Sequence, residues 1–489
     1  MRISALNPKL IRDYVINLLI LLLAFGGMLR RSFNADTVQH MMSPDFDVSF
    51  RMMHGRYLTG LCDFLLGQAG LRTTDHTGIT VLVGLLLMAL SVSFIQLMYR
   101  ELLNLENFFE ELVFLAATNL VFTNVLASEL TMFSEFTAYF AASFALAAIG
   151  AWFFSRRRYV LFIICITASC LFYQTGIILC AILISFHIFL ENKGRITKTV
   201  IFRQTGGLIG VIGIGLANII SVRILVRLVD DYYVIKTFND NNLRENIAEV
   251  IRHSFDMFKG SLGLLPSYYL PLLFSLTMLI IFTWMMIRTK KYQTLFYSLL
   301  LQLCLFVLIY SISIMGGYTS PPPRMIFLFY LVQVTTGITA FHYSKGLTKK
   351  LVGYLFMAYL FLHIFFAQII VTQHFVSNTL DKLYANMVYA KIVEYEEETG
   401  ITVTKLAVGR DADSKHYYDE VSYTSHSVNE RVIGIINWIV VEMVSGRSFE
   451  RLLMDEAFLR EHFGDKDWIY IDLSEQLIIE GDTAYWVIF

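Results

Sequence analysis

Charged residues are scarce in this sequence: they make up 16% of its 489 residues, whereas hydrophobic residues make up 56% and the mean hydropathy is +0.57. Soluble domains carry about 25% charged residues, so the composition excludes an ordinary soluble protein and indicates that lipid is the solvent. Cysteines are also few. Four of the five lie inside apolar stretches and Cys62 stands alone, which excludes a disulfide framework and a cysteine metal motif. The G-x-G-x-x-G and Walker patterns of nucleotide-binding loops are absent as well.

The sequence instead contains apolar stretches of about 17 to 25 residues, the length that a helix needs to cross a hydrocarbon core of roughly 30 Å. A helix is favoured because it satisfies its own backbone hydrogen bonds in lipid. The first stretch lacks a small-residue cleavage site and is predicted to be a retained span rather than a signal peptide. Eleven spans are predicted, near residues 13–29, 77–99, 109–127, 132–154, 159–172, 175–190, 201–222, 268–287, 293–314, 325–343 and 351–373. The fifth and sixth are short because Gln174 and a glycine interrupt them.

Positive charges give the predicted orientation. With the N-terminus in the cytoplasm, five of the six inner segments are short and basic, and only "RELLNLENFFE" departs from the positive-inside rule. The C-terminal region differs in charge: residues 377–489 contain 10 Lys+Arg against 21 Asp+Glu, and the preceding residues contain 29 against 19. We therefore predict a membrane body at 1–376 and an acidic, soluble, extracytoplasmic α/β domain at 377–489.

Two further segments have readable local patterns. In the outer segment 223–267, Ile247, Val250, Ile251, Phe255 and Phe258 recur at helical spacing, which predicts an amphipathic helix on the bilayer surface. In the C-terminal domain, "ITVTKLAVG", "WIYIDLS" and "AYWVIF" are predicted strands, and "ERVIGIINWIVVEMVSG" fits a helix or a strand.

The first outer loop, residues 30–76, carries the residues most suited to chemistry. Asp36 follows the first span directly, where a lipid head group and a water-soluble molecule meet, and a carboxylate there is suited to act as a general base. The same loop is too long for a simple turn, and it also contains Asp45, Asp47, Asp63, Arg51, His54 and Arg56. A solvated carboxylate that only marks a helix end is the alternative for Asp36.

The order of these motifs resembles the GtrII-type glucosyltransferases, which decorate bacterial O-antigens and belong to the GT-C class of polytopic membrane glycosyltransferases. The resemblance rests on "FNADTVQH" (33–40), "HGRYL" (54–58), "YQ" (173–174) and "PPPRMIF" with Arg324. It covers roughly residues 10–375. Such families often carry two adjacent acids in the first loop, whereas Thr37 follows Asp36 here, and Asp45, Asp47 or Glu129 is left to supply a second carboxylate.

The resemblance implies transfer of a hexose, glucose in the first place, from a polyprenyl-phosphate donor to a cell-envelope polysaccharide at the outer face of the bacterial cytoplasmic membrane, with inversion. Asp36 is then the catalytic base, and Arg56 and Arg324 neutralise the departing phosphate. The expected substrate-binding residues are Arg56, Arg324, His54, Tyr173, Gln174, Glu129, Tyr318, Asp45 and Asp47. No metal-ligand spacing is evident, no nucleic-acid partner is expected, and participation of Mg²⁺ or Mn²⁺ is left open.

Other interpretations remain open at this stage. Glu129 fits a solvated helix junction equally well, Tyr173 and Gln174 can simply punctuate two helices, and "GGYTSPPPR" can be a rigid connector. Another GT-C enzyme, a polymerase that uses a different lipid-linked sugar, or a transporter or flippase of lipid-linked sugars are the alternative functions. A transporter places polar or broken helices near the bilayer midplane, whereas the polar residues here gather at the predicted outer face.

Overall fold

The computed structural model describes residues 8–42, 51–229, 243–311, 320–410, 418–464, 466, 468 and 470–488. The chain divides into two compact units: unit 1 is Met1–Arg31 with Asp45–Ile369, and unit 2 is Ser32–Pro44 with Ile370–Phe489. The segment that carries Asp36 therefore groups with the C-terminal residues. The predicted domain boundary after residue 376 stays a prediction, because compactness does not mark where a membrane ends.

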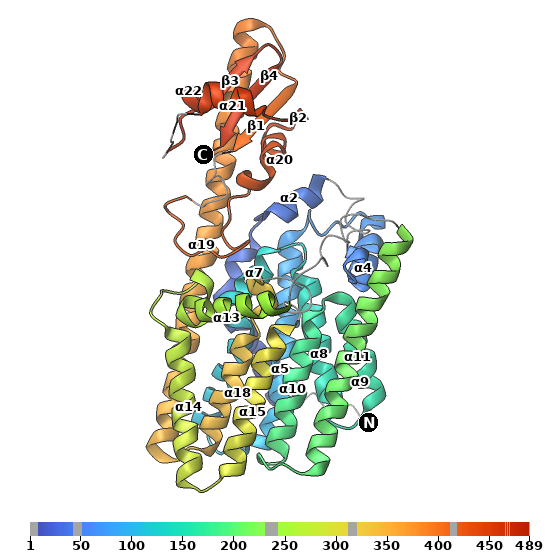
Figure 1. Ribbon diagram of the computed structural model, residues 1–489, viewed down its shortest axis with the longest axis vertical. Helices are drawn as coiled ribbons and strands as arrows, with labels where there is room; N and C mark the ends of the chain where they lie inside the picture. Colours follow the sequence, from blue (N-terminus) through green and yellow to red (C-terminus); the bar gives the residue numbers. More distant parts are fainter. Residues whose placement is uncertain are drawn as a thin grey trace. The chain divides into compact units, whose positions relative to one another are not determined.

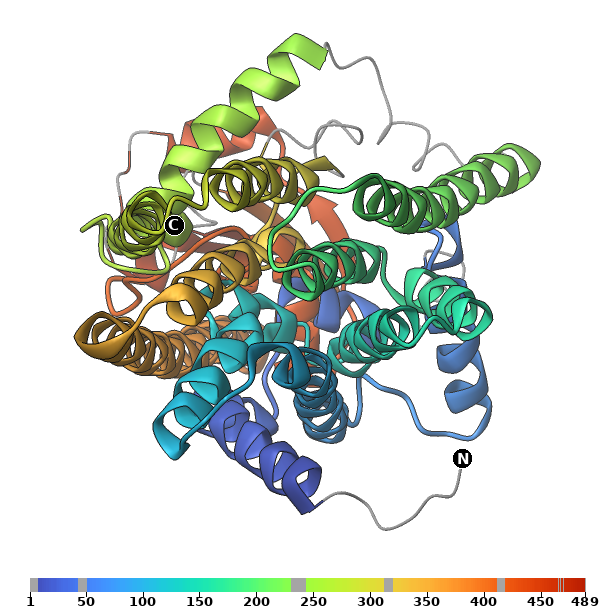
Figure 2. The same ribbon diagram turned by 90° about the horizontal axis from the view of Figure 1, so that it is seen from below.

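Unit 1 is helical. Its elements are α1 (Pro8–Phe25), η1 (Gly26–Leu29), α4 (Tyr57–Gln68), α5 (Thr77–Leu103), α6 (Phe108–Thr123), η2 (Val125–Ala127), α7 (Ser128–Met132), α8 (Thr137–Ser155), α9 (Tyr159–Phe172), α10 (Thr175–Glu191), α11 (Lys198–Val229), α13 (Leu243–Gly260), η4 (Ser261–Gly263), α14 (Leu270–Arg288), α15 (Tyr292–Ile309), α17 (Pro323–Ile326), α18 (Phe329–Tyr343) and the start of α19 (Gly346–Thr399). Figure 1 shows the long helices side by side, and Figure 2 shows them nearly end-on.

In the part of the chain that is described, nine helical segments are long and apolar enough to cross a membrane. They are Lys9–Leu29, Thr77–Leu103, Phe108–Met132, Thr137–Ser155, Lys198–Leu225, Leu270–Arg288, Tyr292–Ile309, Pro323–Tyr343 and Gly346–Thr399. The shorter apolar helices α9 and α10 correspond to the fifth and sixth predicted spans. The prediction of a polytopic helical protein is confirmed, and the break at Tyr173 and Gln174 lies where the sequence placed it.

Small residues let the helices approach closely. Helix α8 packs against α5, α9 and α10. On its side toward α9, Ser143 Oγ donates to Ser169 O at 2.9 Å, and a Cβ built on Gly150 would lie 3.3 Å from Cys165 Cβ. Membrane helices have no hydrophobic driving force between them, so close contact through small side chains supplies the packing energy. The serine and the glycine at these positions therefore explain how closely the short helix α9 fits beside α8.

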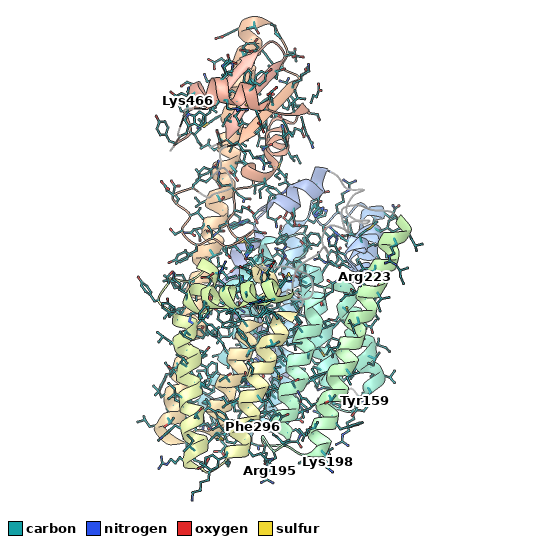
Figure 3. All side chains as sticks on the ribbon, in the orientation of Figure 1. Tyr159, Arg195, Lys198, Arg223, Phe296 and Lys466 are labelled. Atoms are coloured by element: carbon teal, nitrogen blue, oxygen red, sulfur yellow. The ribbon has the colours of Figure 1, made fainter. Side chains whose placement is uncertain are left out.

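The two ends of unit 1 differ in their polar residues. One end carries ion pairs that involve Lys9, Arg12, Arg100, Arg156, Arg203 and Lys349, and we call it the basic end. Figure 3 labels Arg195 and Lys198 at this end and Arg223 near the opposite end of α11. Between the ends, Asn17 donates to Ser93 Oγ and Gln96 Oε1 at 3.0 Å each, which joins α1 to α5 inside the bundle.

Helix α13 runs across the long helices rather than along them (Figure 1). Val250 and Met257 are buried, and the ring of Phe258 lies 5.1 Å from that of Phe329. Ile247, Ile251 and Phe255 are exposed on another face. The predicted amphipathic helix is present, although its apolar residues divide between a face against the bundle and an open face; its contact with a bilayer stays a prediction.

Unit 2 contains α2 (Ala35–Met42), the end of α19, and a small α/β region. The region consists of β1 (Lys405–Arg410), α20 (Ile433–Ser445), β2 (Glu450–Leu453), α21 (Glu456–Phe463), α22 (Leu473–Gln476), β3 (Leu477–Glu480) and β4 (Thr483–Ile488). The sheet order is β2-β1-β4-β3; β1 is parallel to β2 and β4, and β3 is antiparallel to β4. Of the three predicted strands, "ITVTKLAVG" and "AYWVIF" overlap β1 and β4, and the ambiguous segment forms α20.

The predicted strand "WIYIDLS" is wrong among its described residues. Asp472 Oδ1 accepts a hydrogen bond from Ser474 N at 3.0 Å, so the chain turns into the one-turn helix α22 instead of extending. An aspartate that caps a following helix in this way competes with strand pairing. The strand begins only afterwards, at Leu477.

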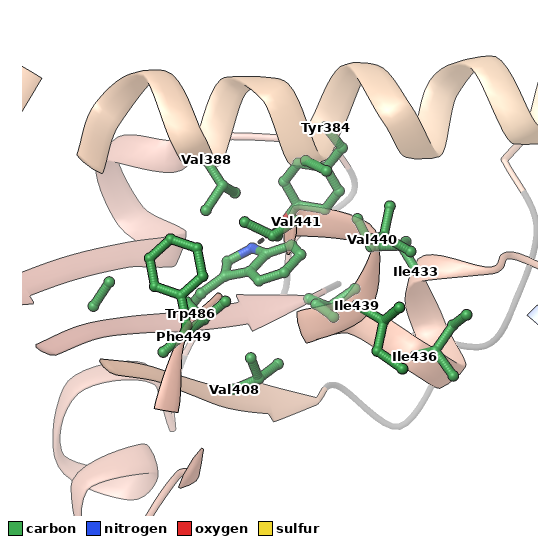
Figure 4. Packing of buried hydrophobic residues seen from close by; sticks show 14 of the residues in the cluster. Tyr384, Val388, Val408, Ile433, Ile436, Ile439, Val440, Val441, Phe449 and Trp486 are labelled. Atoms are coloured by element: carbon green, nitrogen blue, oxygen red, sulfur yellow. Dashed lines mark hydrogen bonds between the residues drawn. The ribbon is translucent and has the colours of Figure 1, made fainter. Parts of the chain in front are cut away.

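Trp486 is the centre of the unit 2 core (Figure 4). Its indole Nε1 donates to Tyr384 Oη at 3.1 Å, and the two rings meet edge to face at 5.2 Å. Nearby, the buried Asp381 of α19 accepts hydrogen bonds from Tyr418 Oη at 2.9 Å and from Val432 N at 2.7 Å. Burial and the charge of Asp381 raise the pKa of Tyr418 well above its ordinary value, so its hydroxyl keeps the proton that it donates.

Candidate functional site

The candidate site is a corner between α6 and α8 at the end of unit 1 opposite the basic end. Helix α6 ends before Asn124. The Nδ2 of Asn124 donates to Leu120 O and Val121 O, and its Oδ1 accepts from Ala127 N, so this side chain caps both sides of the break. The corner continues through α7 to Ser134, whose carbonyl accepts from Thr80 Oγ1 at 2.6 Å. Thr80 lies in the first turn of α5, so the corner lies at the end of the bundle that the charge pattern predicts to face outward.

Four aromatic rings form a connected cluster at this corner, and we call it the aromatic cluster: Phe133, Phe136, Phe140 and Tyr173. The centroid of Phe140 lies 6.4 Å from that of Phe133, 5.9 Å from that of Phe136 and 4.5 Å from that of Tyr173. All four are buried. The cluster therefore joins the corner before α8 to the break between α9 and α10.

Three arginines place their guanidinium groups over rings of this cluster. Arg324 lies 4.4 Å from the centroid of Phe133, Arg51 lies 4.3 Å from that of Phe136, and Arg56 lies 5.1 Å from that of Tyr173. Such cation–π contacts contribute about 0.5 to 2 kcal/mol each, more where water is excluded. Two chain segments far apart in sequence, residues 51–56 and the segment of Arg324, thus bring positive charge to one set of rings, and we call this end of unit 1 the aromatic end.

Glu129 holds Arg324 in place. Its Oε1 accepts from Arg324 Nη1 at 2.6 Å and its Oε2 accepts from the backbone N–H of Arg324 at 2.6 Å. The glutamate is fully buried, and the arginine side chain is 24% exposed. Pro322 and Pro323 precede the arginine at the start of α17, where their fixed φ angles suit the first helical turn. Glu129 is therefore an ion-pair partner within the protein and not a solvated junction residue.

Arg51 has a separate partner on α4. It forms an ion pair with Asp63, which also accepts a hydrogen bond from Tyr139 Oη. The arginine is 1% exposed and the aspartate 9%, so both charges are shielded from water and depend on each other. The sequence placed both residues in the first outer loop with Asp36, but it gave neither of them a role in the site.

The predicted pair of Tyr173 and Gln174 lies next to the predicted His54 and Arg56. Gln174 Nε2 donates to the carbonyl of His54 at 2.6 Å, and Tyr173 carries Arg56 on its ring. The structure thus brings together Arg56, Arg324, Tyr173, Glu129 and Gln174 around the aromatic cluster. Sequence reasoning missed its phenylalanines because the chain has 40 of them, and nothing in their spacing separates these three from lipid-facing ones.

Asp36 belongs to unit 2, in the first turn of α2, where its side chain is exposed. Its position is fixed locally by Asn34, whose Oδ1 accepts from Thr37 N at 2.8 Å. The prediction that Asp36 shares a cavity with Arg56 and Arg324 stays a prediction. Asp45, Asp47 and Tyr318 lie outside the described residues.

Over the described ranges, no three His, Cys, Asp or Glu side chains are grouped so as to hold a metal ion. Comparison with protein-family models, with curated proteins and with solved structures finds no match to this chain. What the site can do chemically follows from its geometry: guanidinium groups on buried rings can donate hydrogen bonds to an anionic oxygen, and arginine suits phosphate in particular.

Proposed function

We propose that the protein is a membrane glycosyltransferase of the GT-C type. It transfers a hexose, glucose in the first place, from a polyprenyl-phosphate donor to a cell-envelope polysaccharide at the outer face of the bacterial cytoplasmic membrane. The proposal is supported by one observation above the others: Arg56 and Arg324, predicted as phosphate partners, both lie on the aromatic cluster at the predicted outer end of unit 1.

The proposed chemistry is a single displacement. Asp36 accepts the proton of the acceptor hydroxyl as its oxygen attacks the anomeric carbon, and the bond from that carbon to the phosphate oxygen breaks with inversion. Arg56 and Arg324 stabilise the negative charge on the departing phosphate. Tyr173, Gln174 and His54 lie beside Arg56 and would contact the sugar or hold that arginine, and Tyr318, Asp45 and Asp47 complete the expected binding set. Mg²⁺ or Mn²⁺ has no assigned step.

A membrane assay with radiolabelled polyprenyl-phosphate hexose and a polysaccharide acceptor tests the proposal. Asp36→Asn should reduce transfer by at least about a hundredfold, the lower range for a general base. Asp75→Asn is the matched control, because Asp75 is an exposed carboxylate in the same predicted loop. Transfer by Asp36→Asn at the wild-type rate removes Asp36 as the base. Repeating the wild-type assay with a chelator shows whether a divalent cation takes part.

Donor binding tests the arginines separately. Arg56→Ala should raise the KM for the donor about tenfold or more, because each hydrogen bond to a charged group contributes about 1.5 to 3 kcal/mol. Arg324→Ala has the same expected direction but also removes the partner of Glu129, so its stability must be measured alongside. An unchanged KM in both variants contradicts the assignment of phosphate to this end.

The alternative is a transporter or flippase for lipid-linked sugars. Transporter binding sites often lie near the bilayer midplane at broken helices, whereas helices α9 and α10, of 14 and 17 residues, are separate spans that meet at Tyr173 and Gln174 at the aromatic end. Proteoliposomes separate the two functions: a transporter moves the labelled lipid to the other leaflet without an acceptor, whereas a transferase labels the acceptor glycan. Varying the labelled sugar distinguishes another GT-C enzyme or a polymerase.

A further inference from the structure

We infer that Gln174 and Asn218 are positioning residues, which hold the turn His54–Gly55–Arg56 and thereby keep the guanidinium of Arg56 on the ring of Tyr173. The inference rests on the proposed function only in giving Arg56 its phosphate. The geometry on which it depends is independent of the ligand.

Both carbonyls at the centre of the turn accept hydrogen bonds from side-chain amides. Gln174 Nε2 donates to His54 O at 2.6 Å, and Asn218 Nδ2 donates to Gly55 O at 2.9 Å. The two amides also meet each other, with Gln174 Nε2 3.3 Å from Asn218 Oδ1. A single chain of amides therefore connects the turn to the break between α9 and α10 and to α11.

Gly55 is required for this approach. Its φ of +73° lies in the left-handed region, and a Cβ built there would lie 2.6 Å from Asn218 Oδ1 and 2.8 Å from Val222 Cγ2. A side chain at position 55 would therefore have to displace the ends of the Asn218 and Val222 side chains. The glycine of "HGR" is explained by the close approach of Asn218 as well as by its backbone conformation.

Two more hydrogen bonds extend the same contact into α4. Tyr57 Oη and Ser221 Oγ are 2.9 Å apart, and Thr59 Oγ1 donates to Phe172 O at 2.9 Å. Asn218 is 6% exposed on α11, and a buried amide without partners would be costly. Its hydrogen bond to the carbonyl of Gly55 gives Asn218 this partner, and we assign to it the role of holding the turn.

The arrangement couples the cation to its ring. Tyr173 and Gln174 are adjacent in the chain, so the same break carries the ring under Arg56 and the amide that holds the turn before Arg56. Loss of either amide frees the turn while leaving Tyr173 in place. The expected result is a guanidinium that samples more positions and meets the donor phosphate less often.

The first test uses no substrate. Purified full-length protein is treated with phenylglyoxal, and the modification rate of Arg56 is followed by peptide mass spectrometry. Gln174→Met and Asn218→Leu keep side-chain size but remove the donors, and each should speed the modification of Arg56 about fivefold to tenfold, the effect of losing one hydrogen bond. Gln68→Met, at the exposed end of α4, is the control. An unchanged rate at Arg56 in both variants overturns the inference.

The second test uses the transfer assay. Each variant should raise the donor KM about fivefold to tenfold with little change in kcat, and neither should add to the effect of Arg56→Ala in the double variant. A further loss of similar size in the Arg56→Ala background shows that the amides act on something else and overturns the inference. Asn218→Ser replaces Asn218→Leu if the larger change prevents folding. Failure of the proposed function would remove transfer altogether but leave the phenylglyoxal result intact.

Discussion

The two ends of unit 1 handle positive charge in different ways. At the basic end, Lys9 and Arg12 pair with Glu111, and their side chains are 59% and 44% exposed. At the aromatic end, Arg51 is 1% exposed, lies on Phe136 and pairs with the buried Asp63. Exposed ion pairs are screened by water and contribute little, whereas removal of one member of a buried pair leaves an uncompensated charge. Ion pairs of arginine are therefore expected to contribute less to the stability of the protein at the basic end than at the aromatic end.

The comparison also explains the one inner segment that departs from the positive-inside rule. Glu110 pairs with Lys349 at 2.6 Å, and Glu111 pairs with Lys9 at 3.1 Å and Arg12 at 2.8 Å. The acidic first turn of α6 therefore pairs with basic residues from the first and last inner segments. Its acids offset part of the positive charge of this end in the folded protein.

The largest effect is expected from Glu129→Gln at the aromatic end. The variant leaves Arg324 without its buried carboxylate partner and should lower the free energy of unfolding in detergent micelles by about 3 to 5 kcal/mol. Adding Arg324→Met to Glu129→Gln should restore part of the loss, because no unbalanced charge remains. A single variant as stable as the wild type would show that this pair is not a buried ion pair in solution.

A smaller effect is expected from Gly55→Ala, also at the aromatic end. The positive φ and the close approach of Asn218 together should cost about 2 kcal/mol in unfolding free energy. Gly70→Ala is the matched control: it has the same φ of +73° but open space around the added Cβ. The difference between the two variants measures the contact with Asn218, and equal losses would show that the backbone conformation alone matters.

Between the two ends, Asn17→Leu should lower the unfolding free energy by about 1 kcal/mol, the usual size for hydrogen bonds between membrane helices. Asn17 joins Ser93, Gln96 and Asn119. Asn192→Leu is the control, since the side chain of Asn192 bonds only to the carbonyl of Ile188 one turn earlier. Equal losses in the two variants would mean that the interhelical network adds nothing.

The smallest effect is expected from Glu111→Gln at the basic end. Two exposed or half-exposed ion pairs are lost, and the change in unfolding free energy should stay under about 1 kcal/mol and shrink further at high salt. A loss as large as that of Glu129→Gln would remove the distinction between the ends.

Much of the helical fold could be predicted because apolar length alone specifies a span. The interruption at Gln174 could also be predicted, because a polar residue and a glycine stand there within an apolar stretch. The break at Asn124 had no such signal, because an asparagine inside a continuous helix looks the same in the sequence. The break depends on the hydrogen bonds of Asn124 to Leu120, Val121 and Ala127. The error at "WIYIDLS" is similar: alternation favoured a strand, and the Asp472 cap decided otherwise.

At the candidate site, residue chemistry pointed to Arg56, Arg324 and Glu129, but their relation depends on tertiary contacts. Sequence order cannot show that Glu129 binds Arg324 rather than a sugar, since 195 positions separate them. Asn218 had a signal that was not used: a lone amide in the apolar stretch of α11 requires a partner. The aromatic rings had no signal, because their number conceals the few that support arginines.

The acidic turn at Glu110 and Glu111 has a consequence for biogenesis. A nascent segment passes the insertion machinery before its distant neighbours exist, so Lys349 is synthesised long after these glutamates have been placed. The lysines and arginines therefore retain full strength as topogenic signals when each hydrophobic segment chooses its direction, and acidic residues hardly oppose them. The two glutamates form their ion pairs only after assembly, so Lys9, Arg12 and Lys349 first direct insertion and later take part in ion pairs that hold the helices together.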